Sequence, residues 1–200
     1  MVSQSQTLTE PMTAEEFLEW SLRSENSEGL HELEDGRIVE VPPPKHLHGV
    51  VCWLVAHILG NHLAPRGGYV VTNDAGLIVK RRPDTVRGPD LMAFVTRPDF
   101  AEIKSVYWEI TPDLIVEVLS PTDRPGKTDR RVKQYLKRGI PLVWVVDPED
   151  RNVIVYAQNQ ESKTLDETDE LTGDGILPGF ACKVGDFFAW PTQPSATSGD

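Results

Sequence analysis

The sequence predicts an α/β (α+β) fold in which a mixed β-sheet core is flanked by helices, and three segments carry this prediction. Residues 114–146 have the pattern of a buried strand, a helix and a second buried strand. Residues 47–63 carry an apolar stripe at helical spacing, which suits a helix that covers a sheet. Residues 31–41 alternate around an Asp-Gly pair, a pattern typical of a β-hairpin.

The chain of 200 residues suits one domain with a full core, and we assign residues 13–190 to that domain. Residues 1–12 are expected to form a flexible N-terminus and residues 191–200 a disordered tail. No leader pattern opens the chain, and no segment approaches the roughly 20 apolar residues of a membrane helix. Cys52 and Cys182 lie far apart, without a zinc-ligand spacing. We therefore expect a cytoplasmic protein with reduced thiols and no membrane contact.

The N-terminal half is predicted to contain two helices and several strands. Thr13 followed by Glu16 forms a capping-box pattern, so the first helix is expected to begin there. The hairpin and the long apolar helix follow, separated by three consecutive prolines. Strands are then expected at 69–72 and 76–80, followed by a basic loop over 80–88. The next strand covers 91–95 and places Asp90 at its mouth.

The C-terminal half is predicted to begin with a parallel crossover. Strand 114–118 is followed by a break, by a helix from about Thr128 to a glycine stop at Gly139, and by strand 142–146. This connection places the end of the first strand beside the start of the helix, so Glu117 is expected near the helix's basic residues. Residues 157–174 are predicted to form a loop or weak hairpin, and 176–190 a terminal strand and turn.

Charge is distributed unevenly along the chain. The net charge of -11 argues against a protein that holds nucleic acid by bulk attraction alone. Residues 123–138 nevertheless hold seven bases against two acids, a local charge of +5. The basic loop over 80–88 forms a second patch with one acid. Each patch alone is typical of a solvated surface. Two patches flanking two lone carboxylates favour a phosphate-rich ligand.

Asp90 and Glu117 are the two carboxylates in question, because each lies beside or within a predicted core strand. Asp90 alone suits a turn residue. If their strands are adjacent, the two carboxylates repel one another and the pKa of one rises, unless a cation lies between them. Mg²⁺ or Mn²⁺ suits such a site, since these ions accept one or two carboxylates, water and a phosphate oxygen. The pair therefore predicts phosphodiester hydrolysis, with a nearby Lys or Arg stabilising the charge on the phosphate.

The motifs around Asp90 and Glu117 also resemble those of known protein families. Pro89-Asp90, then Glu117 in an apolar strand, then a basic helix resemble the PD-(D/E)xK nuclease superfamily. The segments EVLSPTDR, LVWVVDP, HELEDGRIVEVPPP and LPGF resemble the Uma-type family of putative restriction endonucleases within it. The resemblance implies a restriction-endonuclease-like fold, DNA as partner, and Asp90 and Glu117 as metal ligands. It also implies Glu32 and His48 as outer members of the site, although the position of His48 near a helix start equally suits a structural histidine.

The basic catalytic position departs from both patterns. The superfamily's lysine two residues after the acid is Leu119 here, and the lysine that the Uma-type family has on the next helix is Arg131. Arginine keeps the charge and can clamp phosphate, but it does not readily give or take a proton. Lys127 lies one turn earlier on the same face of the helix. We therefore assign Arg131 or Lys127, with Asp90 and Glu117, to the catalytic site.

Three functions follow in order of preference. The first is a Mg²⁺- or Mn²⁺-dependent endodeoxyribonuclease, which a homodimer would equip with two sites for two strands. The second is a nuclease fold without turnover that serves as a DNA-binding or protein-interaction module. The third is a glycosidase with Trp144 and Trp108 as sugar platforms, ranked last because Trp144 lies in a core-like strand. The sequence contains no P-loop, GxGxxG, GxSxG or HExxH motif, which argues against the common nucleotide-binding, esterase and zincin classes.

Overall fold

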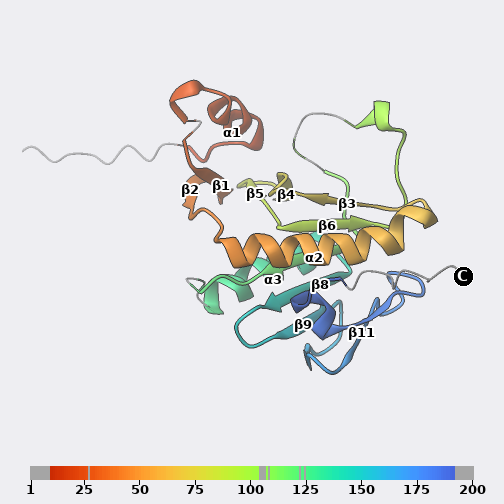
Figure 1. Ribbon diagram of the computed structural model, residues 1–200. Helices are drawn as coiled ribbons and strands as arrows, with labels where there is room; N and C mark the ends of the chain where they lie inside the picture. Colours follow the sequence, from red (N-terminus) through yellow and green to blue (C-terminus); the bar gives the residue numbers. More distant parts are fainter. Residues whose placement is uncertain are drawn as a thin grey trace, which may run out of the picture.

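The computed structural model describes residues 10–26, 28–103, 107, 109–121, 123 and 125–191. The predicted flexible N-terminus and disordered tail lie largely outside these residues, as do Trp108 and Arg124. The described chain forms sheets of six, four and two strands with helices packed against them. The predicted mixed α+β class with helices flanking a sheet is confirmed (Figure 1).

The main sheet has six strands, and all its neighbouring pairs are antiparallel except one. From edge to edge the strands are β10 (Lys163–Asp166), β9 (Asn152–Ala157), β8 (Leu142–Asp147), β7 (Leu114–Val118), β6 (Leu91–Phe94) and β3 (Tyr69–Thr72). The parallel pair is β7 and β8, in register from Leu114 with Leu142 to Val118 with Val146. Helix α3 (Pro125–Arg138) connects them, so the predicted strand, helix and strand unit is present.

The two long helices pack on different residues of this sheet. Helix α2 (His46–Leu63) runs beside β6 and β3 in Figure 1, and its Val51, Val55 and Leu59 pack with Leu114 and Val116. Helix α3 packs with the alternate strand residues in a second apolar cluster, which includes Ile115, Val132, Tyr135 and Val143. Because successive strand residues point to opposite faces, Glu117 shares the face of Ile115 and points toward α3.

The four-stranded sheet carries the N-terminal hairpin. Its order is β2 (Arg37–Val41), β1 (Leu30–Glu34), β5 (Thr85–Arg87) and β4 (Leu77–Lys80), all antiparallel. Helix α1 (Ala14–Ser21) begins with the predicted capping box, in which Thr13 N donates to Glu16 Oε2 at 2.8 Å and Glu16 N donates to Thr13 Oγ1 at 3.2 Å. The predicted turn at Asp35 and Gly36 joins β1 to β2, and both residues have positive φ.

The C-terminal segment completes the fold. Strand β10 extends the main sheet within a segment predicted as a loop or weak hairpin, because it pairs with β9 from Lys163 to Asp166. Strand β11 (Glu170–Thr172) pairs instead with β12 (Ala181–Lys183), and a 3-10 turn over Val184–Phe188 follows. The terminal strand and turn are therefore present as predicted.

The structure corrects the prediction for the basic loop over 80–88. Its residues Thr85–Arg87 form β5, and Arg87 is only 2% exposed. Arg81 forms ion pairs with Glu15, Asp84 and Glu109. The predicted phosphate-attracting patch is therefore wrong in part, since two of its arginines are neutralised by acids distant in sequence.

Two boundaries also differ from the prediction. Helix α3 begins at Pro125, three residues before the predicted start. The segment His46–Arg66 is long and apolar enough to cross a membrane by length and composition, contrary to the expectation that no segment approaches this limit. Five of its residues, Val51, Leu54, Val55, Leu59 and Leu63, are buried in the protein, and 28% of its apolar window is buried. The absence of membrane contact stays a prediction.

Candidate active site

A cavity of about 320 Å³ opens where both large sheets meet the start of α2 and the first turns of α3. Its wall contains residues from segments that are far apart in the sequence. All six residues predicted for the site line it, namely Glu32, His48, Asp90, Glu117, Lys127 and Arg131. The fold therefore brings the predicted catalytic and outer residues together, while their chemical roles stay predictions.

Asp90 and Glu117 belong to adjacent antiparallel strands. Leu91 pairs with Val116, so continuing the register by one residue places Asp90 opposite Glu117. The carboxylate of Asp90 is held on two sides: Val118 N donates to Oδ2 at 2.7 Å, and His48 Nε2 lies 3.1 Å from Oδ1. The hydrogen bond to Asp90 also raises the pKa of His48. Asp90 thus has a fixed orientation at the mouth of β6.

Glu117 is 8% exposed and has fewer compensating contacts than its burial demands. Tyr135 donates its hydroxyl to Oε1, and Arg131 Nη1 lies 3.4 Å from Oε2. Burial raises the pKa of Glu117 to about 7; Arg131 opposes this shift and the negative charge of Asp90 adds to it. One guanidinium at this distance is therefore insufficient to keep the carboxylate at its ordinary pKa.

Glu32 lies on the opposite wall and has a full set of donors. Arg87 Nη1 donates to Oε2 at 2.9 Å and Gly88 N donates to Oε1 at 3.0 Å, while Arg131 contacts Oε1 as well. Burial alone would raise the pKa of Glu32, but the guanidinium groups of Arg131 and Arg87 outweigh burial and lower it. Gln134 accepts a further hydrogen bond from Arg87 at 3.0 Å, which fixes the arginine against α3.

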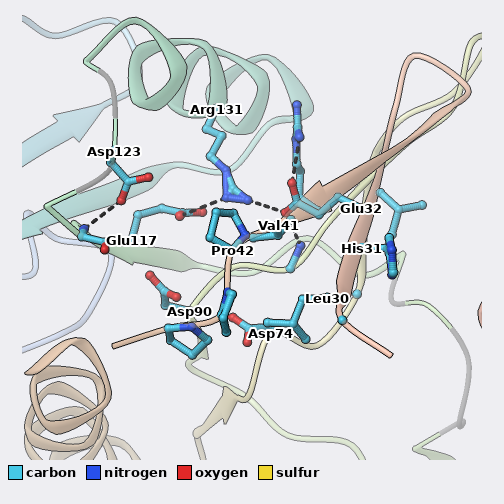
Figure 2. A pocket seen from close by; sticks show the side chains of 18 of the residues that line it. Leu30, His31, Glu32, Val41, Pro42, Asp74, Asp90, Glu117, Asp123 and Arg131 are labelled. Atoms are coloured by element: carbon cyan, nitrogen blue, oxygen red, sulfur yellow. Dashed lines mark hydrogen bonds and ion pairs between the residues drawn. The ribbon is translucent and has the colours of Figure 1, made fainter. Parts of the chain in front are cut away.

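Arg131 joins the two walls. Figure 2 shows its side chain extending from α3 to lie between Glu117 and Glu32. Its buried Nε has no hydrogen-bond partner among the residues that the structure describes. Lys127, Arg131 and Tyr135 follow one another at four-residue intervals along α3, so they lie on the same side of the helix. Lys127 is exposed at the cavity wall, whereas Tyr135 is buried.

Sequence reasoning did not assign Asp74 to the site. Asp74 follows β3 with positive φ and lines the cavity, and Figure 2 shows it near Asp90. Burial raises the pKa of Asp74, and the negative charge of Asp90 raises it further. The sequence predicts only that Asp74 is part of an Asn-Asp turn, and this pattern does not indicate that the residue lines a cavity.

Cys52 is a second residue that was not assigned. It lies one helical turn after His48, and its Sγ is 3.6 Å from His48 Nδ1. Burial raises the pKa of the Cys52 thiol, so the thiol is protonated at neutral pH. Its four-residue spacing from His48 is the only sequence signal that could have drawn attention to it.

The buried position of Trp144 argues against the glycosidase reading. Trp144 is 0% exposed and packs against Phe180 and Phe187 inside the core, so it offers no platform for a sugar. The other predicted platform, Trp108, lies outside the described residues. The described part of the chain therefore supplies a carboxylate pair without the expected aromatic platform.

Comparisons with known proteins identify the family and a structure of similar fold. The chain matches a family model described as Uma2, putative restriction endonuclease, over residues 14–185. It is also similar to a solved structure from Anabaena variabilis described as a putative nuclease belonging to DUF820. The sequences are 24% identical, the match covers 89% of this chain and 98% of that chain, and the TM-score is 0.74. An identity this low shows a shared fold. No curated protein matches the chain.

Proposed function

The chain belongs to the Uma2 family of putative restriction endonucleases, and from this premise we propose that it is a metal-dependent endonuclease that hydrolyses DNA phosphodiester bonds. The observation that carries the proposal is the position of Asp90 opposite Glu117 at one wall of the cavity. Two close carboxylates at a cavity wall suit a hard divalent cation and, through it, a phosphate. A cytoplasmic location is part of this proposal, because DNA is the proposed substrate.

The donor set fits Mg²⁺ or Mn²⁺. Asp90 is oriented by Val118 N and His48, and Glu117 is buried with too little positive charge around it. A cation bound by both carboxylates would keep Glu117 ionised and remove its repulsion with Asp90. When bound, such an ion activates a water molecule and stabilises the negative charge that develops on phosphate. Asp90 and Glu117 are the residues that would hold it.

The remaining residues position these two carboxylates and the phosphate. Tyr135 holds Glu117 through its hydroxyl, and His48 holds Asp90. Arg131 already contacts Glu117 and Glu32, so it sets the charge balance of the site and has limited freedom to turn toward a phosphate. Lys127 is exposed on the same side of α3, and a flexible ammonium there can reach a phosphate oxygen. We therefore assign phosphate orientation first to Lys127.

Cleavage of supercoiled plasmid in Mg²⁺ or Mn²⁺ tests the proposal. We expect the wild type to nick or linearise the plasmid and Glu117→Gln to reduce the rate by at least about 100-fold. Glu161→Gln is the matched control, since Glu161 is exposed in the connection between β9 and β10. Circular dichroism shows whether each variant is folded. Equal cleavage by wild type and Glu117→Gln would overturn the proposal.

One observation favours a second function, a nuclease fold that binds DNA or protein without turnover. The position of the family's helix lysine holds Arg131, which is bound to two carboxylates and is a poor proton carrier. This reading predicts no cleavage by folded wild type in any divalent metal. Binding of a fluorescent DNA duplex measured by anisotropy would then support a DNA-binding module, and absence of binding would favour a protein partner.

A further inference from the structure

A second group of metal-binding side chains lies beside the carboxylate pair. A ring nitrogen of His48, Cys52 Sγ and a carboxylate oxygen of Asp90 all lie within 4.8 Å of one another. His48 and Cys52 come from consecutive turns of α2, and Asp90 comes from the start of β6. Two ligands four residues apart on a helix, with a third from another element, form a compact triangle.

The spacing within this group matches the spacing of ligands around a tetrahedral ion. Zn–S bonds of about 2.3 Å and Zn–N bonds of about 2.0 Å place tetrahedral S and N ligands about 3.5 Å apart. Cys52 Sγ and His48 Nδ1 are 3.6 Å apart, so these two atoms need little movement to share an ion. Asp90 Oδ1 lies 3.1 Å from the other ring nitrogen of His48, and the three ligand atoms lie within 4.8 Å of one another, so a turn of the imidazole would let all three bind one ion.

The surroundings also suit a cation. The carboxylates of Asp74, Asp90 and Glu117 act electrostatically on Cys52. His48 and Asp90 line the open cavity, with side-chain exposures of 13% and 12%, so an ion can reach them from solvent. The only nearby guanidinium within the described site that contacts these acids is Arg131, which is bound to Glu117 and Glu32. A protonated His48 compensates part of this charge through Asp90 Oδ1 at 3.1 Å, and a bound cation would take over that role.

We propose that His48, Cys52 and Asp90 form a binding site for a thiophilic divalent ion of the Zn²⁺ class, distinct in chemistry from the Asp90 and Glu117 pair. A thiolate and an imidazole select Zn²⁺ or Co²⁺ over Mg²⁺, which prefers oxygen ligands. Binding forms a metal–sulfur bond, and the thiol proton of Cys52 leaves to solvent.

Asp90 belongs to both groups, which makes the two ions competitors. An ion bound by Cys52, His48 and Asp90 withdraws Asp90 from the pair with Glu117. This consequence for activity rests on the proposed function: Zn²⁺ is expected to suppress Mg²⁺-dependent cleavage, and loss of Cys52 is expected to relieve the suppression. The thiophilic site itself requires no nuclease activity.

Titration with Co²⁺ under reducing conditions tests the site without reference to activity. A Co²⁺–thiolate bond gives a ligand-to-metal charge-transfer band in the near ultraviolet. We expect the band in wild type and in Cys182→Ser, its loss in Cys52→Ser, and at least tenfold weaker Co²⁺ binding by Cys52→Ser in calorimetry. Cys182 is a matched control, since it is the other free, partly buried cysteine and lies on β12.

Three results would overturn the site: no charge-transfer band in wild type, an unchanged band in Cys52→Ser, or a band lost in Cys182→Ser. His48→Gln supplies a second variant if Cys52→Ser fails to fold, and it is expected to weaken Co²⁺ binding at least tenfold. Displacement of bound Co²⁺ by Zn²⁺, followed as loss of the band, separates a Zn²⁺-class site from nonspecific cobalt binding. A wild-type protein that binds Co²⁺ through Cys52 yet cuts no DNA would support this site and refute the nuclease.

Discussion

The two walls of the cavity shift the pKa of a buried carboxylate in opposite directions. On the β1 and β5 wall, Glu32 receives hydrogen bonds from Arg87 and Gly88 as well as Arg131, and its pKa is lowered. On the β6 and β7 wall, Glu117 shares Arg131 and adds only Tyr135, and its pKa is raised. Both residues are under 10% exposed. Burial alone therefore does not decide the direction in which the pKa of a carboxylate shifts.

The difference lies in how many donors surround each carboxylate. A carboxylate that accepts several charged hydrogen bonds is satisfied by the protein, and removing a partner leaves an uncompensated buried charge. A carboxylate with a charge deficit at a cavity wall gains from an external cation. We infer that the Glu32 wall supports the fold and that the Glu117 wall binds the ligand. Four predictions test this division, from the largest expected effect to the smallest.

Removal of Arg87 should have the largest effect on stability. Arg87 is buried and pairs with Glu32 at 2.9 Å and Glu34 at 3.0 Å, so Arg87→Met leaves buried negative charge. We expect a loss of about 3–5 kcal/mol in the free energy of unfolding, measured by urea denaturation. Arg130→Met is the control: Arg130 is exposed and 3.5 Å from Glu34, so its loss should cost under about 1 kcal/mol. Similar losses for both variants would contradict a structural Glu32 wall.

Metal affinity should separate the two acids. Glu117→Gln is expected to weaken Mn²⁺ binding on the order of 100-fold, equivalent to about 2.7 kcal/mol, because it removes a proposed ligand. Glu32→Gln should change Mn²⁺ affinity by less than about threefold, since Glu32 is already satisfied by arginine and amide donors. Isothermal titration calorimetry measures both constants. A larger loss for Glu32→Gln would reverse the assignment of the walls.

Arg131→Lys tests whether the arginine between the two walls limits turnover. Lysine keeps the charge near Glu117 and can exchange a proton, which arginine does not readily do. If the missing lysine limits turnover, plasmid nicking should increase on the order of tenfold. Arg131→Met is the companion variant and should decrease nicking. A decrease in both variants would show that the guanidinium contacts to Glu117 and Glu32 matter more than proton transfer.

The acid dependence of stability should show the smallest effect. Because the pKa of Glu32 is lowered below 4.5 in the folded protein, the unfolded chain binds more protons there. The stabilisation is therefore present above pH 4.5 and is lost as the pH falls through the lower folded pKa. We expect the free energy of unfolding, measured in urea between about pH 6 and 3, to fall less steeply with decreasing pH for Glu32→Gln than for wild type. Identical acid limbs would mean that Glu32 gains no net stabilisation from its donors.

Local patterns were sufficient to predict most elements and the central pair of acids. The capping box at Thr13 and the Asp-Gly turn act within a few residues, so neighbouring side chains and backbone decide them. Asp90 and Glu117 could be selected because a charged residue beside or inside an apolar strand conflicts with burial, and only a partner or ligand resolves that conflict. The Uma-type resemblance stated from the same residues is confirmed by the family match.

Only the tertiary structure decided which charges neutralise one another. Arg87 looked like part of a basic loop, but strand pairing between β1 and β5 buries it against Glu32, 55 residues away. Arg131 contacts Glu32, which is 99 residues away in the sequence. Cys52 lies near Asp90 only because α2 packs beside β6. Secondary structure depends on near neighbours in sequence, whereas Coulomb interactions and desolvation depend on distance in space, which is set by the packing of the whole chain.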